Sequence, residues 1–294
     1  VIAFEPRELY KILRNNQQRD TMIWLYDDTK KKSGGELSTP HVIAGVTLSR
    51  TLPPFLPANF FARQHLLEKI DVRAPGTTLI VGPIGYGKTS LAIEIAHRNP
   101  GRTFWYTMVD EDSPTKFNSH VIQAVRNVIP GFAPWFKTDL YIEPMDLIAR
   151  FSKELETLKG EYIFIVDNRR TKSAEDFAVA KEMIKTLPHN MHLIQVRNDQ
   201  PDASPSDLAP IGKLNSVGPA ELKFSSEEMM TMIALSGLSE KSKPIFEILE
   251  STQGWPAAVQ LIIRGAAKGV GFKVTAKQIS SSVDPLRLVA AEFV

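Results

Sequence analysis

The sequence predicts an α/β protein, with a parallel five-stranded sheet covered by helices and followed by a small helical domain. Between about residues 59 and 223, short apolar segments rich in β-branched residues alternate with segments of helical period. This alternation is typical of parallel sheets with helices on both faces. After Phe224 the apolar residues keep a helical period only. We therefore expect a sheet domain over 59–223 and a helical domain over 224–275.

Composition narrows the class of protein. The 294 residues are 43% hydrophobic and 23% charged, enough for one large domain or two smaller ones. A formal net charge of +2 is too small to indicate nucleic acid or an anionic membrane as a partner. The lack of cysteine excludes disulfides, thiolate metal sites and cysteine nucleophiles. No apolar run approaches the ~18 residues of a membrane helix and no signal peptide is visible, so we predict a cytoplasmic protein with no membrane partner.

The first 58 residues stand apart from the alternating pattern. We predict a strand-helix-strand segment over 1–35, because apolar runs flank a stretch of helical spacing. A linker is expected over 36–58, after a polar stretch that ends in two glycines. Asp27 and Asp28 follow an apolar run, as acids at a metal site often do, but they come before the glycine-rich loop described below. They are more typical of a turn.

The elements of the two domains follow in order. Apolar, β-branched runs predict strands at Thr77–Val81, Thr103–Val109, Tyr162–Asp167, His192–Arg197 and about Lys213–Val217. Helical spacing predicts helices at Phe60–Ile70, Thr89–Arg98, about Ser113–Val128, Glu143–Leu158 and Ala174–Thr186. In the helical domain, Ser225 and Glu228 fit a capping box at the start of a helix. Three glycines mark the ends of helices, Gly237, Gly254 and Gly269.

A glycine-rich loop joins the first strand of the sheet to the next helix. Its residues are Gly82, Pro83, Ile84, Gly85, Tyr86, Gly87, Lys88 and Thr89, which fit the pattern G-x-x-x-x-G-K-[ST]. The glycines let the backbone close around an anion, and the helix N-terminus adds partial positive charge. An ordinary glycine turn is the alternative, but the flanking strand and helix favour a phosphate site. We expect these residues and Ser90 to bind a nucleotide, with Lys88 on the β- and γ-phosphates and Thr89 on Mg²⁺.

The natural partner of this loop is the strand that ends in Asp167. A buried strand ending in an acid delivers a carboxylate to the carboxyl edge of the sheet, where Mg²⁺ would lie beside the loop. The next residue is Asn168, where many ATPases of this broad class carry a second acid. An amide cannot accept a proton, so we expect slow hydrolysis or none. Asp110 or Glu111 could replace the missing base, although a solvated loop acid is the commoner explanation.

Arg197 ends the strand that begins at about His192. An arginine at the carboxyl end of a sheet strand can bind a γ-phosphate, because the guanidinium matches phosphate with two parallel hydrogen bonds. The alternative is a surface arginine at the end of a strand. The pattern alone does not decide between them.

Taken together, these motifs resemble those of the STAND ATPases. Besides the glycine-rich loop and Arg197, the similar parts are the acid-rich run Phe104–Pro114 leading to Phe117, and Thr252–Ala257. The resemblance runs from about Pro53 to the C-terminus and is greatest to the maltose-regulon activator branch of large LuxR-type transcriptional regulators. It implies a P-loop NTPase domain that binds ATP or ADP with Mg²⁺, then a helical domain, a winged helix, sensor repeats and a DNA-binding helix-turn-helix. It also implies an open, oligomerising ATP state and a closed, inactive ADP state.

The resemblance assigns roles to single residues. The residues that match the family's catalytic groups are Lys88, Asp167 and Arg197, and those that match its Mg²⁺ ligands are Thr89 and Asp167. Pro256 matches a proline that packs on the adenine from the helical domain, and Trp255 beside it is expected to be a core aromatic. Arg63 matches a nucleotide-side arginine that precedes the core of the domain.

The chain departs from the family pattern at two places. Asn168 replaces the usual second acid, which favours a nucleotide-gated switch over a fast ATPase. Residues 276–294 resemble the start of a winged-helix region that is cut short, so we expect contact with DNA only through a domain absent from this chain. The expected partners are an adenine nucleotide and, in the ATP state, a second copy or a regulatory protein. Alternatives are a P-loop kinase acting on a small molecule, and a nucleotide-independent scaffold with a relic loop.

Overall fold

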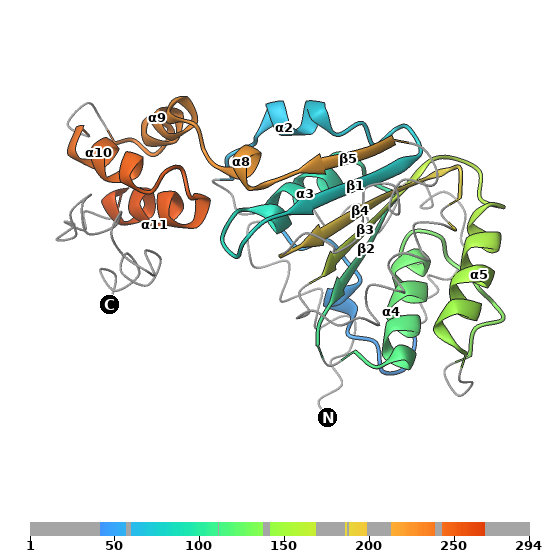
Figure 1. The fold of residues 1–294 in the computed structure, drawn as a ribbon. Coiled ribbons are helices and arrows are strands. Elements are labelled where there is room, and N and C mark those ends of the chain that lie inside the picture. The colour runs from blue at the N-terminus through green and yellow to red at the C-terminus, as the bar shows by residue number, and fades with distance from the viewer. Residues whose placement is uncertain are drawn as a thin grey trace, which may run out of the picture.

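The computed structural model describes residues 42–56, 60–110, 112–137, 142–168, 186, 188–198, 213–238 and 243–267. Within these ranges a parallel sheet with its helices lies next to a separate group of helices (Figure 1). Several expectations lie outside the described residues. These are the strand-helix-strand segment over 1–35, Asp27 and Asp28, Glu111, nearly all of the helix at Ala174–Thr186, Gly269, and residues 276–294.

The sheet has five strands, and every neighbouring pair is parallel. The strands are β1 (Gly76–Val81), β2 (Thr103–Met108), β3 (Tyr162–Asn168), β4 (Met191–Arg197) and β5 (Lys213–Val217). Their order is β2-β3-β4-β1-β5, so β1 lies between β4 and β5. The chain leaving β1 therefore emerges next to the end of β4, with Val81 opposite Arg197. The predicted parallel α/β fold of a P-loop NTPase is confirmed.

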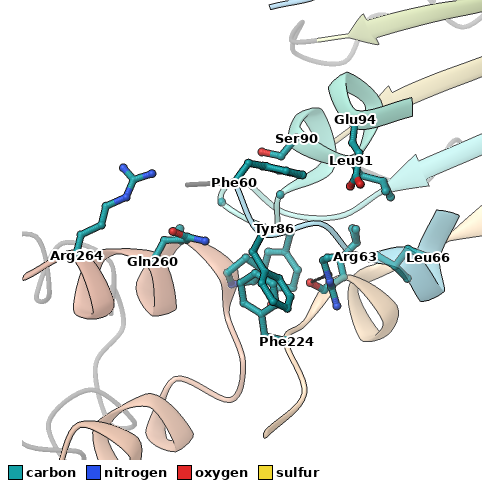
Figure 2. Close-up of a pocket in the computed structure, with 16 residues that line it drawn as sticks. Phe60, Arg63, Leu66, Tyr86, Ser90, Leu91, Glu94, Phe224, Gln260 and Arg264 are labelled. Atoms are coloured by element: carbon teal, nitrogen blue, oxygen red, sulfur yellow. Dashed lines mark hydrogen bonds between the residues drawn. The ribbon is translucent and has the colours of Figure 1, made fainter. Parts of the chain in front are cut away.

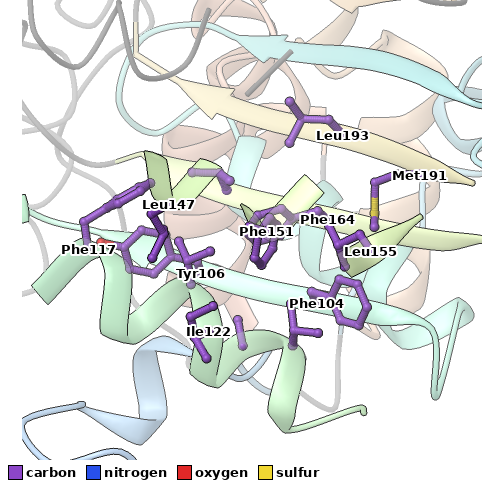
Figure 3. Packing of buried hydrophobic residues seen from close by; sticks show 14 of the residues in the cluster. Phe104, Tyr106, Phe117, Ile122, Leu147, Phe151, Leu155, Phe164, Met191 and Leu193 are labelled. Carbon is purple, nitrogen blue, oxygen red and sulfur yellow. The ribbon is translucent and has the colours of Figure 1, made fainter. Parts of the chain in front are cut away.

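Two apolar cores cover the two faces of the sheet. On one face, Phe104 and Tyr106 pack with α4 (Pro114–Arg126) and α5 (Pro144–Leu155), as Figure 3 shows. On the other face, Trp105 packs with α3 (Lys88–Arg98) and α2 (Gln64–Lys69). Successive residues of a strand point to opposite faces, so both faces need apolar side chains and the strands read as continuous apolar runs. Of the helices that the structure describes, none is long and apolar enough to cross a membrane.

The helix expected at Phe60–Ile70 begins only at Gln64. Its cap, Arg63, lies outside the helical region of backbone conformation, with φ −108° and ψ 72°. Phe61 instead packs edge-on against Phe224, with ring centroids 6.0 Å apart. The predicted start was wrong because Phe61 packs against a residue far along the chain and lies in a non-helical segment.

Three helices after the sheet form their own apolar cluster. They are α9 (Ser226–Leu235), α10 (Lys243–Ser251) and α11 (Pro256–Ala267). Two short helical elements lie earlier in the chain, η3 (Leu48–Arg50) and α8 (Pro219–Leu222). Met232, Leu249 and Ile262 are among the buried side chains of the cluster. The capping box predicted at the start of α9 is present. Ser225 Oγ accepts from the Glu228 N–H at 3.2 Å, and the Glu228 carboxylate accepts from the Ser225 N–H at 2.9 Å.

We expect Ser225→Ala to lower the free energy of unfolding by about 1 kcal/mol, because it removes the side-chain acceptor at the first turn of α9. Urea denaturation of the variant and the starting protein measures this change. Ser226→Ala is the matched control, since the Ser226 hydroxyl reaches Glu250 only at 3.4 Å. Equal losses in the two variants would contradict the role of the cap.

Candidate functional site

The glycine-rich loop connects β1 directly to α3. Gly85 and Gly87 have φ values of +83° and +76°, a left-handed conformation that glycine adopts without strain. Gly87 is the N-cap of α3, and Lys88 is the first residue of the helix. A loop with this backbone ends at a helix N-terminus, which is a favourable place for a phosphate group.

Lys88 and Thr89, the expected phosphate and Mg²⁺ ligands, are the first two residues of α3. The Lys88 ammonium donates to the Pro83 carbonyl at 2.8 Å, across the loop. Burial lowers the pKa of Lys88, and the nearby charge of Asp167 opposes that shift. Thr89 Oγ1 donates to Asp167 Oδ1 at 3.1 Å, so the two expected Mg²⁺ ligands are in contact.

The chemistry of these groups suits Mg²⁺. Among the described residues, no group of three or more histidine and acidic side chains gathers as a complete metal cage. Mg²⁺ at nucleotide sites is held by one or two protein oxygens together with phosphate and water. A threonine hydroxyl beside a buried aspartate, such as Thr89 with Asp167, fits this pattern.

Arg197 ends β4 between the loop strand β1 and the strand β3 that carries Asp167. The Arg197 side chain is buried, and its Nε has no hydrogen-bond partner within the described part of the chain. Its carbonyl accepts from the Gly82 N–H at 3.3 Å, so the backbone of Arg197 adjoins the start of the loop. A buried donor left unpaired is costly, and an anion at the loop would supply the acceptor it lacks.

The helical domain contacts the glycine-rich loop directly. The Ala257 N–H, near the start of α11, donates to the Gly85 carbonyl at 3.0 Å. A Cβ at Gly85 would lie 2.9 Å from Ala257 Cβ and 3.0 Å from Trp255 Nε1, so only glycine allows this approach. Trp255 Nε1 is buried and lacks a hydrogen-bond partner within the described ranges. Pro256, the first residue of α11, is buried at the same junction.

A pocket of about 280 Å³ opens beside the loop. The loop, α3, residues 60–66, the chain around Phe224 and α11 form its walls (Figure 2). Its lining residues are Phe60, Phe61, Arg63, Leu66, Gly85, Tyr86, Gly87, Ser90, Leu91, Glu94, Leu222, Phe224, Pro256, Ala257, Gln260 and Arg264. Flat aromatic walls next to a phosphate loop suit a nucleobase. The pocket thus joins parts of both predicted domains.

Comparison with known proteins agrees with these motifs. No family model matches the chain. It is 24% identical over 192 residues to the HTH-type transcriptional regulator MalT of Vibrio cholerae, covering 63% of this chain and 21% of that protein. It is also 24% identical over 220 residues to MalT of Cronobacter sakazakii, covering 71% of this chain and 24% of that protein. The chain therefore spans about a fifth to a quarter of the curated relatives it matches.

One solved structure is similar over most of the fold. It is a Signal Transduction ATPase with Numerous Domains (STAND) protein with a tetratricopeptide repeat sensor, from Pyrococcus horikoshii. The TM-score is 0.60 at 18% sequence identity, and the match covers 85% of this chain and 34% of the other. The chain resembles the STAND-class P-loop ATPases. Within that class, the sequence resemblance is to the MalT regulators.

The surroundings of Asn168 bear on whether another acid could act as the base. Asn168 is the half-buried last residue of β3, opposite Met108. Asp110 is exposed beyond the end of β2, where a solvated loop acid is the expected explanation, and no observation tests the alternative that it acts as the base. The next described acid, Asp112, is buried and bonded to Arg50 and to the Tyr106 hydroxyl. Burial alone would raise the pKa of Asp112, but its hydrogen bonds, first among them the one from Arg50, lower the pKa. This carboxylate is therefore part of the packing of β2.

Arg63 lies in the pocket wall, but its guanidinium donates hydrogen bonds to other residues of the protein. It donates to the carbonyls of Glu221, Leu222 and Lys223 at 2.6–3.2 Å and to both oxygens of the Glu228 carboxylate. It also lies 4.8 Å from the centre of the Phe224 ring. Through these hydrogen bonds, Arg63 holds the connection between α8 and α9 in place. A contact between Arg63 and the nucleotide stays a prediction.

Sequence reasoning missed several pocket residues of the STAND-like site. They are Phe60, Phe61, Leu66, Leu91, Glu94, Leu222, Phe224, Ala257, Gln260 and Arg264. Glu94 carried a usable signal, because it is an acid on the apolar face of α3. The others depend on the approach of α11 and residues 60–66, which no local pattern specifies.

Proposed function

We propose that this chain is the ATP- or ADP-binding switch module of a STAND-type signalling or transcriptional regulator. The nucleotide would bind with Mg²⁺ between the P-loop domain and the helical domain. The observation that carries the proposal is the contact of the α11 N-terminus with the phosphate loop, at the rim of one shared pocket. A ligand in that pocket touches both domains and so can bias their relative position.

In this proposal, each residue of the loop and its neighbours contacts a different part of the nucleotide. Backbone N–H groups of the loop and the Lys88 ammonium would hold the β- and γ-phosphates. Thr89 and Asp167 would hold Mg²⁺, which when bound neutralises charge on the transferring phosphoryl group. The buried Nε of Arg197 would donate to the γ-phosphate and lose that acceptor after hydrolysis. Asn168 can orient a water molecule but cannot take its proton, which suits slow hydrolysis.

Pro256 and the aromatic side chains would enclose the base. Pro256 belongs to α11, while Phe60 and Tyr86 belong to the P-loop domain, and all three line the pocket. The ATP state would expose surface for a second copy or a regulatory protein. The contact between Thr89 and Asp167 speaks against a relic loop, since it keeps the metal ligands in place.

The proposal is tested by limited proteolysis with and without ADP and Mg²⁺. We expect ADP to slow cleavage within residues 224–267, because a nucleotide in the shared pocket holds α11 on the loop. AMP is the matched control, since it lacks the β-phosphate that the loop would bind, and should protect less. Equal cleavage of this region with ADP, with AMP and without nucleotide would show that the domains do not share a site.

A further inference from the structure

Glu94 is a buried acid whose carboxylate is only half paired. The residue is 3% exposed and lies on α3 between Leu91 and Ile95, which are core residues. Its Oε1 accepts from Arg98 at 2.9 Å, one turn further along the helix. Its Oε2 is buried and has no hydrogen-bond partner among the described residues. A buried carboxylate oxygen without a donor is unfavourable, so the site is complete only when something donates to it.

Glu94 is one of the residues that line the pocket beside the phosphate loop. Among the described residues that line this pocket, Glu94 is the one with a buried, unpaired polar side-chain atom. Arg98 also donates to Gln64 at 2.9 Å, which places this side of α3 against the start of α2. Glu94 and the aromatic side chain of Phe60 line the same pocket (Figure 2).

The position of Glu94 along α3 corresponds to the base of a nucleotide. Glu94 lies six residues after Lys88, which is about 9 Å along the helix axis. Ser90 lies between them and lines the same pocket. A nucleotide with its β-phosphate at Lys88 and its length along α3 brings its base, and not its phosphates, to the level of Glu94.

We infer that Glu94 selects the base by accepting a hydrogen bond from the 6-amino group of adenine. An ionised carboxylate only accepts hydrogen bonds, so it favours a base edge that carries N–H groups. A 6-oxopurine such as hypoxanthine would place an oxygen against the carboxylate and leave both without a donor. This inference rests on the proposed nucleotide binding and adds to it the group that distinguishes amino from oxo purines.

The test compares three diphosphates by calorimetry on the whole chain. ADP carries the 6-amino group, purine riboside diphosphate has hydrogen there, and inosine diphosphate has oxygen. We expect purine riboside diphosphate to bind about 10–100-fold more weakly than ADP, as for loss of a hydrogen bond to a charged group, and inosine diphosphate more weakly still. In Glu94→Gln, an amide of the same shape can donate to the 6-oxo group, so inosine diphosphate should bind within about threefold of ADP.

Glu68→Gln is the matched control, because Glu68 is an exposed acid on the neighbouring helix α2 and should leave all ratios unchanged. Equal affinities for ADP and purine riboside diphosphate would overturn the inference. So would a Glu94→Gln variant with unchanged ratios. In each of these cases the proposed nucleotide binding would still hold if ADP binds the starting protein and its affinity falls in Lys88→Ala. If none of the diphosphates binds the starting protein, the proposed function itself fails.

Discussion

Asn168→Asp is expected to raise the single-turnover rate of ATP hydrolysis by about 10²–10⁴-fold, the usual contribution of a positioned general base. Asn168 ends β3, directly after the buried Asp167 that contacts Thr89. An aspartate there has nearly the shape of the asparagine but can take a proton from the attacking water. The charge stabilisation expected from Lys88, Mg²⁺ and Arg197 is present in both proteins, so the difference measures the missing base.

Asp110→Asn is the matched control for this experiment, because Asp110 is an exposed acid just beyond β2. It should change the rate little. Fast hydrolysis by the starting protein that is abolished in Asp110→Asn would place the base on β2 and contradict our interpretation of Asn168. No gain from Asn168→Asp would contradict the assignment of slow hydrolysis to the missing base.

Lys88→Ala is expected to weaken binding of ATP and ADP by about 1.5–3 kcal/mol, the range for a hydrogen bond to a charged group. Lys88 is buried at the first turn of α3, and its ammonium reaches across the loop to the Pro83 carbonyl. No lysine is among the described residues that line the adjoining pocket, so the variant has no neighbouring ammonium there to replace Lys88. Isothermal titration calorimetry with ADP and Mg²⁺ measures the loss.

Lys116→Ala controls for the removal of a lysine, because Lys116 is exposed on α4, which packs on the other face of the sheet from α3. It should bind nucleotide like the starting protein. Circular dichroism on both variants separates a binding defect from unfolding. Unchanged ATP and ADP affinity in a folded Lys88→Ala variant would remove the basis for the phosphate site.

The sheet could be predicted from the sequence because its strands are buried on both faces. Phe104, Trp105 and Tyr106 point alternately into the two cores, and each core demands apolar side chains. The run of apolar residues therefore marks the strand without reference to its neighbours. The glycine-rich loop was equally visible, because Gly85 and Gly87 occupy left-handed conformations that few other residues adopt.

The pocket could not be predicted in the same way, because it depends on contacts between distant parts of the chain. Phe61 has the spacing of a helical residue, yet its position is set by Phe224. Arg63 matched a nucleotide-side arginine, but its hydrogen bonds go to the carbonyls before α9 and to Glu228. The positions of Phe61 and Arg63 both follow from the contact between the helical domain and the sheet domain. Local secondary-structure propensity carries no information about that contact.

The hydrogen bond from Ala257 to the Gly85 carbonyl bears on kinetics as well as on affinity. Gly85 belongs to the phosphate loop and Ala257 to α11, so a nucleotide held as proposed is enclosed by both. Such a nucleotide leaves only when α11 lifts from the loop, and its residence time is then set by how often that separation occurs. Contacts far from the phosphates, such as the packing of α9 on α11, would lengthen or shorten the lifetime of the bound state without touching the nucleotide.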